Sequence, residues 1–138
     1  MKSRKRWQGA TAVAMAVTLA AMAVATVQAA PNPKKGRRTY NQYCVPCHGK
    51  AGDGNGTRAT VENLDPKPRN HTDGKYMNQR TNVQLFKVDR EGGKANNFSH
   101  IMPQWKHILK DDEIWDVIAY IRSLAVPKYQ EPTGGNGQ

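Results

Sequence analysis

The strongest constraint in this sequence is a short motif, Cys44-Val45-Pro46-Cys47-His48, which contains both cysteines of the 138-residue chain. Because the two cysteines lie within four consecutive residues, a scaffold held together by several disulfides is excluded. A chain of this length has room for one domain. The spacing inside the motif, rather than the overall composition, therefore carries the information about chemistry.

The C-x-x-C-H spacing is the attachment signature of a c-type haem. Two thiols three positions apart on a tight turn can each add to one vinyl group on the same edge of a porphyrin. The next residue then projects its imidazole toward the iron. The motif predicts one covalently attached haem c, bound through Cys44 and Cys47, with His48 as an iron ligand.

Three other chemistries use a C-x-x-C pair. A redox dithiol belongs in a βαβ context, and no alternating strand pattern is present here. A structural zinc site usually needs a second ligand pair at regular spacing, whereas His71, His100 and His107 are scattered. A plain disulfide fits an oxidising compartment but leaves His48 without a role.

The first 29 residues are typical of an export signal. Basic residues at positions 2–6 precede an uncharged, alanine-rich stretch at 9–27, and small residues surround the end at Ala29. We therefore predict a signal peptide over 1–29, cleaved after Ala29, and a periplasmic protein without stable membrane insertion afterwards. The alternative is an uncleaved membrane anchor, since the stretch is almost long enough to span a bilayer, but alanine favours insertion far less than leucine or isoleucine does.

Cleavage would remove four of the 21 Lys and Arg residues and none of the 11 Asp and Glu residues, which leaves a net charge of +6. We expect the functional domain to cover 30–126 and a disordered tail to cover 127–138, where glycines are dense. A domain of this size has a thin core that a large apolar cofactor helps to fill. The excess of basic residues permits acidic partners.

The mature chain is predicted to be all-α, with long loops and no strands. We expect a helix up to about Cys44 and a short helix over 73–80. A further helix begins at an N-cap, Thr81 or Asn82, and ends at Gly92; Val83, Phe86 and Val88 share one of its faces. The clearest helix begins with acidic residues at 111–113 and ends before Pro127. Its apolar residues recur at helical spacing: Ile114, Trp115, Val117, Ile118, Ile121 and Leu124.

With these motifs in place, the chain resembles the class I, mitochondrial-type monohaem cytochromes c of the bacterial periplasm, over nearly all of its mature length. Gly36 and Tyr40 stand eight and four residues before Cys44, as the small and aromatic residues of that family's first helix do. Tyr120 matches their aromatic partner on the last helix. The resemblance implies the small cytochrome c fold, in which helices and loops wrap around one covalently bound haem.

The resemblance also implies a second axial ligand, a methionine in a downstream loop, and Met102 before Pro103 matches it. A thioether suits the role because it is soft and raises the reduction potential. Met77 and, more weakly, His100 are rival ligands. The metal site is therefore predicted as His48 and Met102.

The family supports its haem histidine with a proline carbonyl, which Pro66 or Pro68 would supply here; the sequence does not decide between them. Trp105 and Tyr76 are candidates to line the haem pocket or to reach a propionate, although both are equally consistent with plain packing.

Other motifs in the chain fail their tests. The glycine-dense segment 52–56 lacks the lysine of a phosphate-binding loop and the later ligands of an EF-hand. The basic residues have no interleaved aromatics and no nucleic-acid-binding motif, so we expect no nucleic-acid partner.

The resemblance implies a soluble electron carrier, not an enzyme, whose iron cycles between Fe(III) and Fe(II) and exchanges electrons with protein donors and acceptors that have acidic docking faces. Two alternatives remain. One is an electron-relay subunit of a periplasmic dehydrogenase or oxidase complex. The other is an open-site haem sensor or enzyme, which requires that Met102 does not bind iron.

Overall fold

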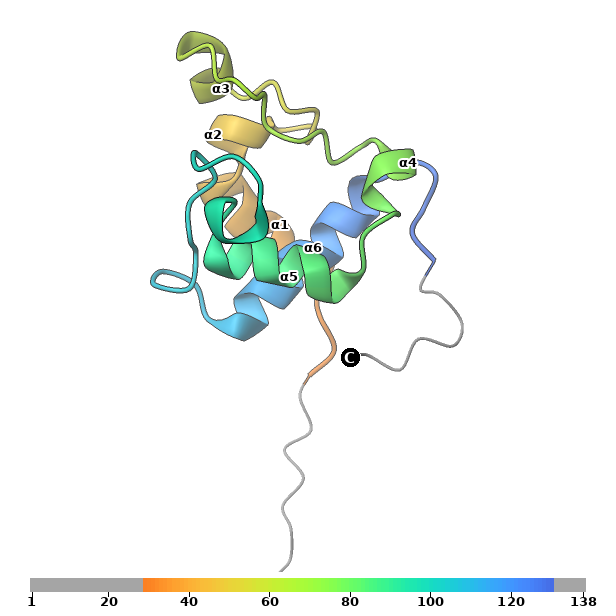
Figure 1. Ribbon diagram of the computed structural model, residues 1–138. Helices are drawn as coiled ribbons and strands as arrows, with labels where there is room; N and C mark the ends of the chain where they lie inside the picture. The colour runs from red at the N-terminus through yellow and green to blue at the C-terminus, as the bar shows by residue number, and fades with distance from the viewer. Residues whose placement is uncertain (1–28, 131–138) are drawn as a thin grey trace, which may run out of the picture.

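Two helices from opposite ends of the sequence form the centre of the molecule. The computed structural model describes residues 29–130, in which α1 (Pro33–Tyr43) packs against α6 (Asp111–Leu124), as Figure 1 shows. The N-terminus of α1 is set by Asn32, whose side-chain oxygen accepts hydrogen bonds from the amides of Lys34 and Lys35. The expected first and last helices are confirmed, and the first already begins at Pro33.

The contact between α1 and α6 depends on a glycine and two tyrosines. A Cβ atom on Gly36 would lie 1.8 Å from the backbone oxygen of Asp116, so only a hydrogen fits there. One turn later, Tyr40 is fully buried, and its ring meets that of Tyr120 edge-to-face with centroids 5.1 Å apart. The expected interlock of Gly36, Tyr40 and Tyr120 is thus confirmed.

We expect Gly36→Ala to lower the free energy of unfolding by about 1–3 kcal/mol, because the added methyl group forces the two helix backbones apart. Denaturant unfolding followed by circular dichroism measures this. Lys35→Ala is the matched control, because Lys35 is exposed on the same helix and its loss should change stability by less than about 0.5 kcal/mol. Equal stability of the two variants would contradict the close helix contact.

The helix α5 (Asn82–Glu91) packs on the other side of α6. Thr81, one of the two predicted N-caps, caps it in a reciprocal capping box with Gln84. Its buried residue is Leu85, whereas Val83, which the sequence places on the inner face, is 41% exposed. Phe86 stacks on Trp115 of α6 with ring centroids 4.5 Å apart.

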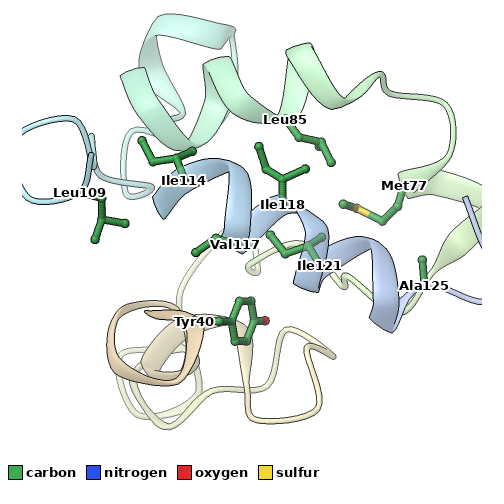
Figure 2. Close-up of a cluster of buried hydrophobic side chains, with 9 residues drawn as sticks. All are labelled: Tyr40, Met77, Leu85, Leu109, Ile114, Val117, Ile118, Ile121 and Ala125. Carbon is green, nitrogen blue, oxygen red and sulfur yellow. The ribbon is translucent and has the colours of Figure 1, made fainter. Parts of the chain in front are cut away.

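The hydrophobic core gathers along α6, as Figure 2 shows. Arg122 fastens α4 (Gly74–Met77) to this helix by donating to the carbonyl oxygen of Met77 at 2.8 Å. The buried core residues come from five segments of the chain and are Tyr40, Met77, Leu85, Leu109, Ile114, Val117, Ile118, Ile121 and Ala125.

Short elements complete the chain. The turn α2 (Val45–His48) follows α1 directly, and α3 (Thr57–Val61) and the 3₁₀ turn η1 (Lys94–Asn96) were not predicted. The predicted short helix over 73–80 is α4. Residues 29–130 contain no β-strand, only one isolated parallel bridge between Asp73 and Val126. The predicted all-α class is confirmed.

The described part of the chain extends beyond the predicted domain end at 126. Asn78 donates its side-chain amide to the carbonyl oxygens of Pro127 and Lys128, and the guanidinium of Arg122 lies 3.6 Å from the ring centroid of Tyr129. Ordered contacts therefore continue to Tyr129, because the segment after α6 folds back onto α4. The remainder of the predicted tail and residues 1–28 of the predicted signal peptide lie outside the described residues. Within 29–130, every helix is too short or too polar to cross a bilayer.

Candidate functional site

The motif Cys44–His48 forms the junction between α1 and α2. The amide of Cys44 donates to the carbonyl of Tyr40 at 2.8 Å and so closes α1, and the amide of His48 donates to the carbonyl of Cys44 at the same distance. This single turn directs three side chains into one cavity, because residues three and four positions apart share a helix face. Cys44, Cys47 and His48 all line that cavity.

The environment of Cys44 differs from that of the nucleophilic cysteine of a reactive dithiol. Burial raises the pKa of the Cys44 thiol strongly, and the charges of Asp89 and Cys47 add to the effect. Redox-active and nucleophilic cysteines have lowered pKa values instead. Together with the absence of strands from 29–130, this pKa shift disfavours the dithiol alternative.

A cavity of about 600 Å³ lies beside the motif, within the size range of cofactor sites. The segment 64–69, the helices α4 and α5, and the loop around Met102 close its other sides. Cys44, Cys47, His48 and Met102 all line it. The four predicted site residues, the first and last of which are 58 positions apart in the sequence, therefore meet in one place.

His48 is held in one orientation by a backbone carbonyl. Its Nδ1–H donates to the carbonyl oxygen of Arg69 at 3.0 Å, which leaves Nε2 available as a ligand. Burial lowers the pKa of His48, and the hydrogen bond to Arg69 only partly opposes this, so the neutral, metal-binding form is favoured.

The carbonyl belongs to Arg69 and not to Pro66 or Pro68, which corrects the prediction. A Cβ atom on Gly54 would lie 2.4 Å from the carbonyl oxygen of Pro68, so that carbonyl is directed at the glycine loop. The next peptide group, that of Arg69, is then the one that faces His48. Gly54 adopts φ +84°, and its amide donates to the carbonyl of His48 at 2.8 Å, which ties the loop to the motif.

A second histidine, which sequence reasoning treated as scattered, supports His48. The rings of His71 and His48 are stacked, with centroids 4.2 Å apart and planes inclined by 15°. The Nδ1 atom of His71 and the buried hydroxyl of Tyr40 form a hydrogen bond of 3.0 Å. Burial, then the nearby His48 and Arg69, hold the pKa of His71 well below its usual value, so the ring is neutral. The crossing of α1 and α6 is thereby connected to the orientation of His48.

The loop that carries Met102 is fixed against the end of α5. The amide of Gly93 donates to the carbonyl oxygen of Met102 at 3.0 Å, and a Cβ atom on Gly93 would lie 3.1 Å from that of Met102. Gly92 ends α5 with φ +80°, as the sequence predicts. The two glycines thus admit the Met102 backbone at a distance that larger residues would prevent.

The rival ligands are placed differently. Met77 also lines the cavity, but it is only 2% exposed and packs with the side chains of α6, as Figure 2 shows. His100 is exposed and is not part of the cavity wall. The structure therefore brings two methionines to the cavity and leaves His100 outside it.

Polar groups on the cavity wall fit the carboxylates of a haem. The Nε1–H of Trp105 is buried and has no hydrogen-bond acceptor among residues 29–130. The ring of Tyr76 lies between the guanidinium groups of Arg69 and Arg80, at 3.8 and 3.9 Å from its centroid. The wall positions of Trp105 and Tyr76 agree with the prediction. The sequence analysis did not identify Arg69 and Arg80 as cavity residues. The negative charge of the haem propionates was a usable signal, because an anionic cofactor needs cations near it.

These features together match what a haem requires: a large apolar cavity, two thiols on one edge, a neutral imidazole with its tautomer fixed, a thioether, and cations for the propionates. Arg69 and Arg80 are placed to pair with the propionates, and Trp105 offers a further N–H donor. The residues present thus fit the cofactor that the motif predicts.

Comparisons with known proteins agree with this fit. The family model for cytochrome c matches residues 33–125. A thiosulfate dehydrogenase of Allochromatium vinosum is 32% identical over 114 residues, which are 79% of this chain but 37% of that protein. A chain of the reducing HAO-like protein complex of Kuenenia stuttgartiensis is 25% identical and superposes with a TM-score of 0.59 over 75% of this chain and 48% of its own.

The chain therefore spans less than half of the length of either relative. The family match, by contrast, runs from the first residue of α1 to the residue after α6, and it includes every residue that lines the cavity. With its C-x-x-C-H motif, this protein belongs to the cytochrome c family and carries one covalently bound haem c.

Proposed function

We propose that this protein is a soluble periplasmic electron carrier in which Cys44 and Cys47 hold the haem and His48 and Met102 are its axial ligands. The observation that supports this most is the convergence of all four residues on one cavity, with the His48 tautomer fixed by Arg69. The cytochrome c domain by itself indicates that the protein transfers electrons by means of a haem. When bound, the haem supplies an iron that accepts and releases one electron.

The side chains of the site keep that chemistry restricted to electron transfer. Cys44 and Cys47 would hold the haem through two thioether bonds, each formed by addition of one S–H across one vinyl double bond. His48 and Met102 would both ligate the iron, and with both bound no coordination position would be open for oxygen or a substrate. The apolar part of the wall would shield the haem from water, and we expect electrons to enter and leave at the motif edge, at Cys44 and Cys47.

The charge around the cavity favours acidic partners. Four basic residues, Arg58, Lys67, Arg69 and Arg80, contribute to its wall, against one acidic residue, Asp89. Arg58 is paired with Glu62, and Lys67 and Arg69 are exposed. Because Arg69 and Arg80 are placed to pair with the propionates, Lys67 is the wall cation that remains to attract negatively charged donors and acceptors, and salt weakens this attraction.

A second function is favoured by the comparisons. Because the chain spans 37% of the thiosulfate dehydrogenase and 48% of the HAO-like complex chain, related domains occur within larger redox proteins. An electron-relay subunit of a periplasmic complex uses the same site. Purification of the chain at its native level distinguishes the two roles: a relay subunit co-purifies with a larger enzyme, and a carrier elutes alone.

The test of the site is a spectrum and a mass measurement on the protein exported to the periplasm. We expect the mass of one haem added to a chain that begins at residue 30, and a low-spin ferric spectrum with a sulfur-to-iron charge-transfer band. Carbon monoxide should not change the ferrous spectrum. A high-spin spectrum that responds to carbon monoxide would favour the open-site sensor or enzyme, and colourless protein with free thiols would overturn the proposal.

A further inference from the structure

The cavity wall contains one part-buried acidic residue, Asp89, that neither the attachment motif nor the axial ligands explain. Asp89 lies in the last turn of α5, and its carbonyl oxygen accepts the amide of Trp105 at 3.1 Å. Asp89 lines the cavity together with Cys44, Trp105 and Met102. The carboxyl oxygen Oδ2 is buried and has no hydrogen-bond donor among residues 29–130. Buried carboxylates are normally paired, so this group needs an explanation.

The basic residues that adjoin Asp89 in the fold are engaged elsewhere. Arg90 forms ion pairs with Glu91 and Asp111, and Lys106 forms one with Glu91. Both cations therefore point into a surface network in which Glu91 is shared. Asp89 faces the cavity without an ion pair in the described part of the chain.

The titratable groups that act on Asp89 from the packed elements are Tyr40 of α1 and Cys44 at its C-terminal end. Burial, the largest effect for each, raises the pKa of both groups, so both are neutral at neutral pH, and Cys44 has no proton to lose once it is a thioether. Burial alone raises the pKa of Asp89 to about 7. The protonation of Asp89 is therefore open to control by a charge placed in the cavity.

We propose that Asp89 couples electron transfer to proton transfer: it takes up a proton from solvent when the haem in the cavity is reduced, and releases it on oxidation. This inference rests on the proposed function. In the balanced step, one electron from the donor converts Fe(III) to Fe(II), and a hydronium ion transfers its proton to the Asp89 carboxylate, which forms one O–H bond and leaves water. Oxidation reverses both transfers.

The direction follows from electrostatics in a poorly solvated site. Ferric haem carries one more positive charge than ferrous haem, and this charge favours an ionised carboxylate on the cavity wall. Reduction removes the charge, so the pKa of Asp89 is higher in the ferrous protein than in the ferric protein. Between these two pKa values, the reduction potential falls as pH rises; below and above them it is constant.

The test compares Asp89→Asn with Asp112→Asn in the haem-loaded protein. Asp112 is an exposed carboxylate on α6, so its substitution removes the same charge from the surface. The reduction potential is measured by spectroelectrochemical titration from about pH 5 to about pH 9, which brackets the raised pKa. We expect wild type and Asp112→Asn to share the pH dependence, with a slope of at most one proton per electron. Asp89→Asn should be nearly independent of pH and should keep the higher, acid-limit potential.

An infrared difference spectrum of reduced minus oxidised wild-type protein provides a readout that does not depend on a variant. A band of protonated carboxyl should appear on reduction, shift in D₂O, and be absent from Asp89→Asn. A pH dependence that persists in Asp89→Asn, which would assign it to the propionates, overturns the inference, as does the absence of the band from wild type. If the haem is low-spin and is reduced reversibly, either of these results leaves the carrier proposal intact. If the protein does not bind haem, the carrier proposal itself is overturned.

Discussion

The double variant Cys44→Ala/Cys47→Ala should lose covalent haem and, with it, most of its helical structure. Both thiols lie on the wall of a cavity of about 600 Å³ at the junction of α1 and α2. Without haem, the apolar side chains of this wall would be exposed to water, and the domain would lose the stabilisation that comes from burying them. A small domain has about 5–15 kcal/mol of stability in total, so the folded state without haem should not persist.

Far-ultraviolet circular dichroism of the purified double variant measures this effect. Pro46→Ala is the matched control, because it changes an exposed residue inside the same motif and retains both thiols and His48. The control should bind haem and show wild-type helicity. A double variant with native-like helicity and cooperative unfolding would show that the polypeptide forms its own core, and the haem would then be an addition to a finished fold.

Met102→Leu should change the reduction potential by a few tenths of a volt, within the roughly 0.8 V range that axial ligands cover. Leucine retains the volume of methionine but cannot bind iron, so the sixth position should open, the spectrum should become high-spin, and carbon monoxide should bind to the ferrous form. Spectroelectrochemical titration and the response to carbon monoxide measure both consequences.

Met77→Leu is the control for this prediction, since Met77 lines the same cavity and is the other methionine on its wall. Its position in the core with the side chains of α6 assigns it to packing, and a volume-conserving change there should cost less than about 1.5 kcal/mol and leave the potential near that of wild type. If Met77→Leu shifts the potential and Met102→Leu does not, the axial assignment is wrong and Met77 is the ligand.

The two experiments separate the roles of the site residues. The cysteine variant tests whether the fold depends on the haem, and the methionine variant tests how the iron is ligated in a protein that stays folded. The loop of Met102 is fixed by backbone contacts of Gly92 and Gly93, which do not involve the methionine sulfur. Loss of the thioether should therefore change the electronic properties of the iron without unfolding the loop.

Features governed by near neighbours in the chain were predictable. The C-x-x-C-H spacing depends on one turn of backbone, the cap at Thr81 depends on a residue three positions later, and the glycine stop at Gly92 depends on its own φ. The interlock of Gly36, Tyr40 and Tyr120 spans the chain, and it was anticipated only because the pattern resembles that of a known family. The structure explains why position 36 is a glycine: a Cβ atom there would lie 1.8 Å from the backbone oxygen of Asp116, so a larger residue would prevent the close contact of the two helices.

Features that depend on several distant segments were not predictable. The inner face of α5 is at Leu85 because α6 packs against it there, and hydrophobicity alone does not distinguish Leu85 from Val83. The choice of Arg69 rather than a proline as the partner of His48 depends on how closely Pro68 approaches Gly54. Both features depend on contacts between segments that are far apart in the sequence, so the pattern within one helix turn does not predict them.

The sequence by itself determined the chemistry of this protein: two thiols and an imidazole at a spacing that fits one porphyrin edge, on a chain of helices too small to fill its own core. Only the tertiary structure decided what surrounds that chemistry, namely the stacking of His71 on His48, the two guanidinium groups on Tyr76, and the Asp89 Oδ2 atom, which has no hydrogen-bond donor among residues 29–130. The physical reason is range. Helix periodicity, caps and motif spacing act over a few residues, whereas burial and the pKa shifts that follow from it are set when segments far apart in the chain close around a common cavity.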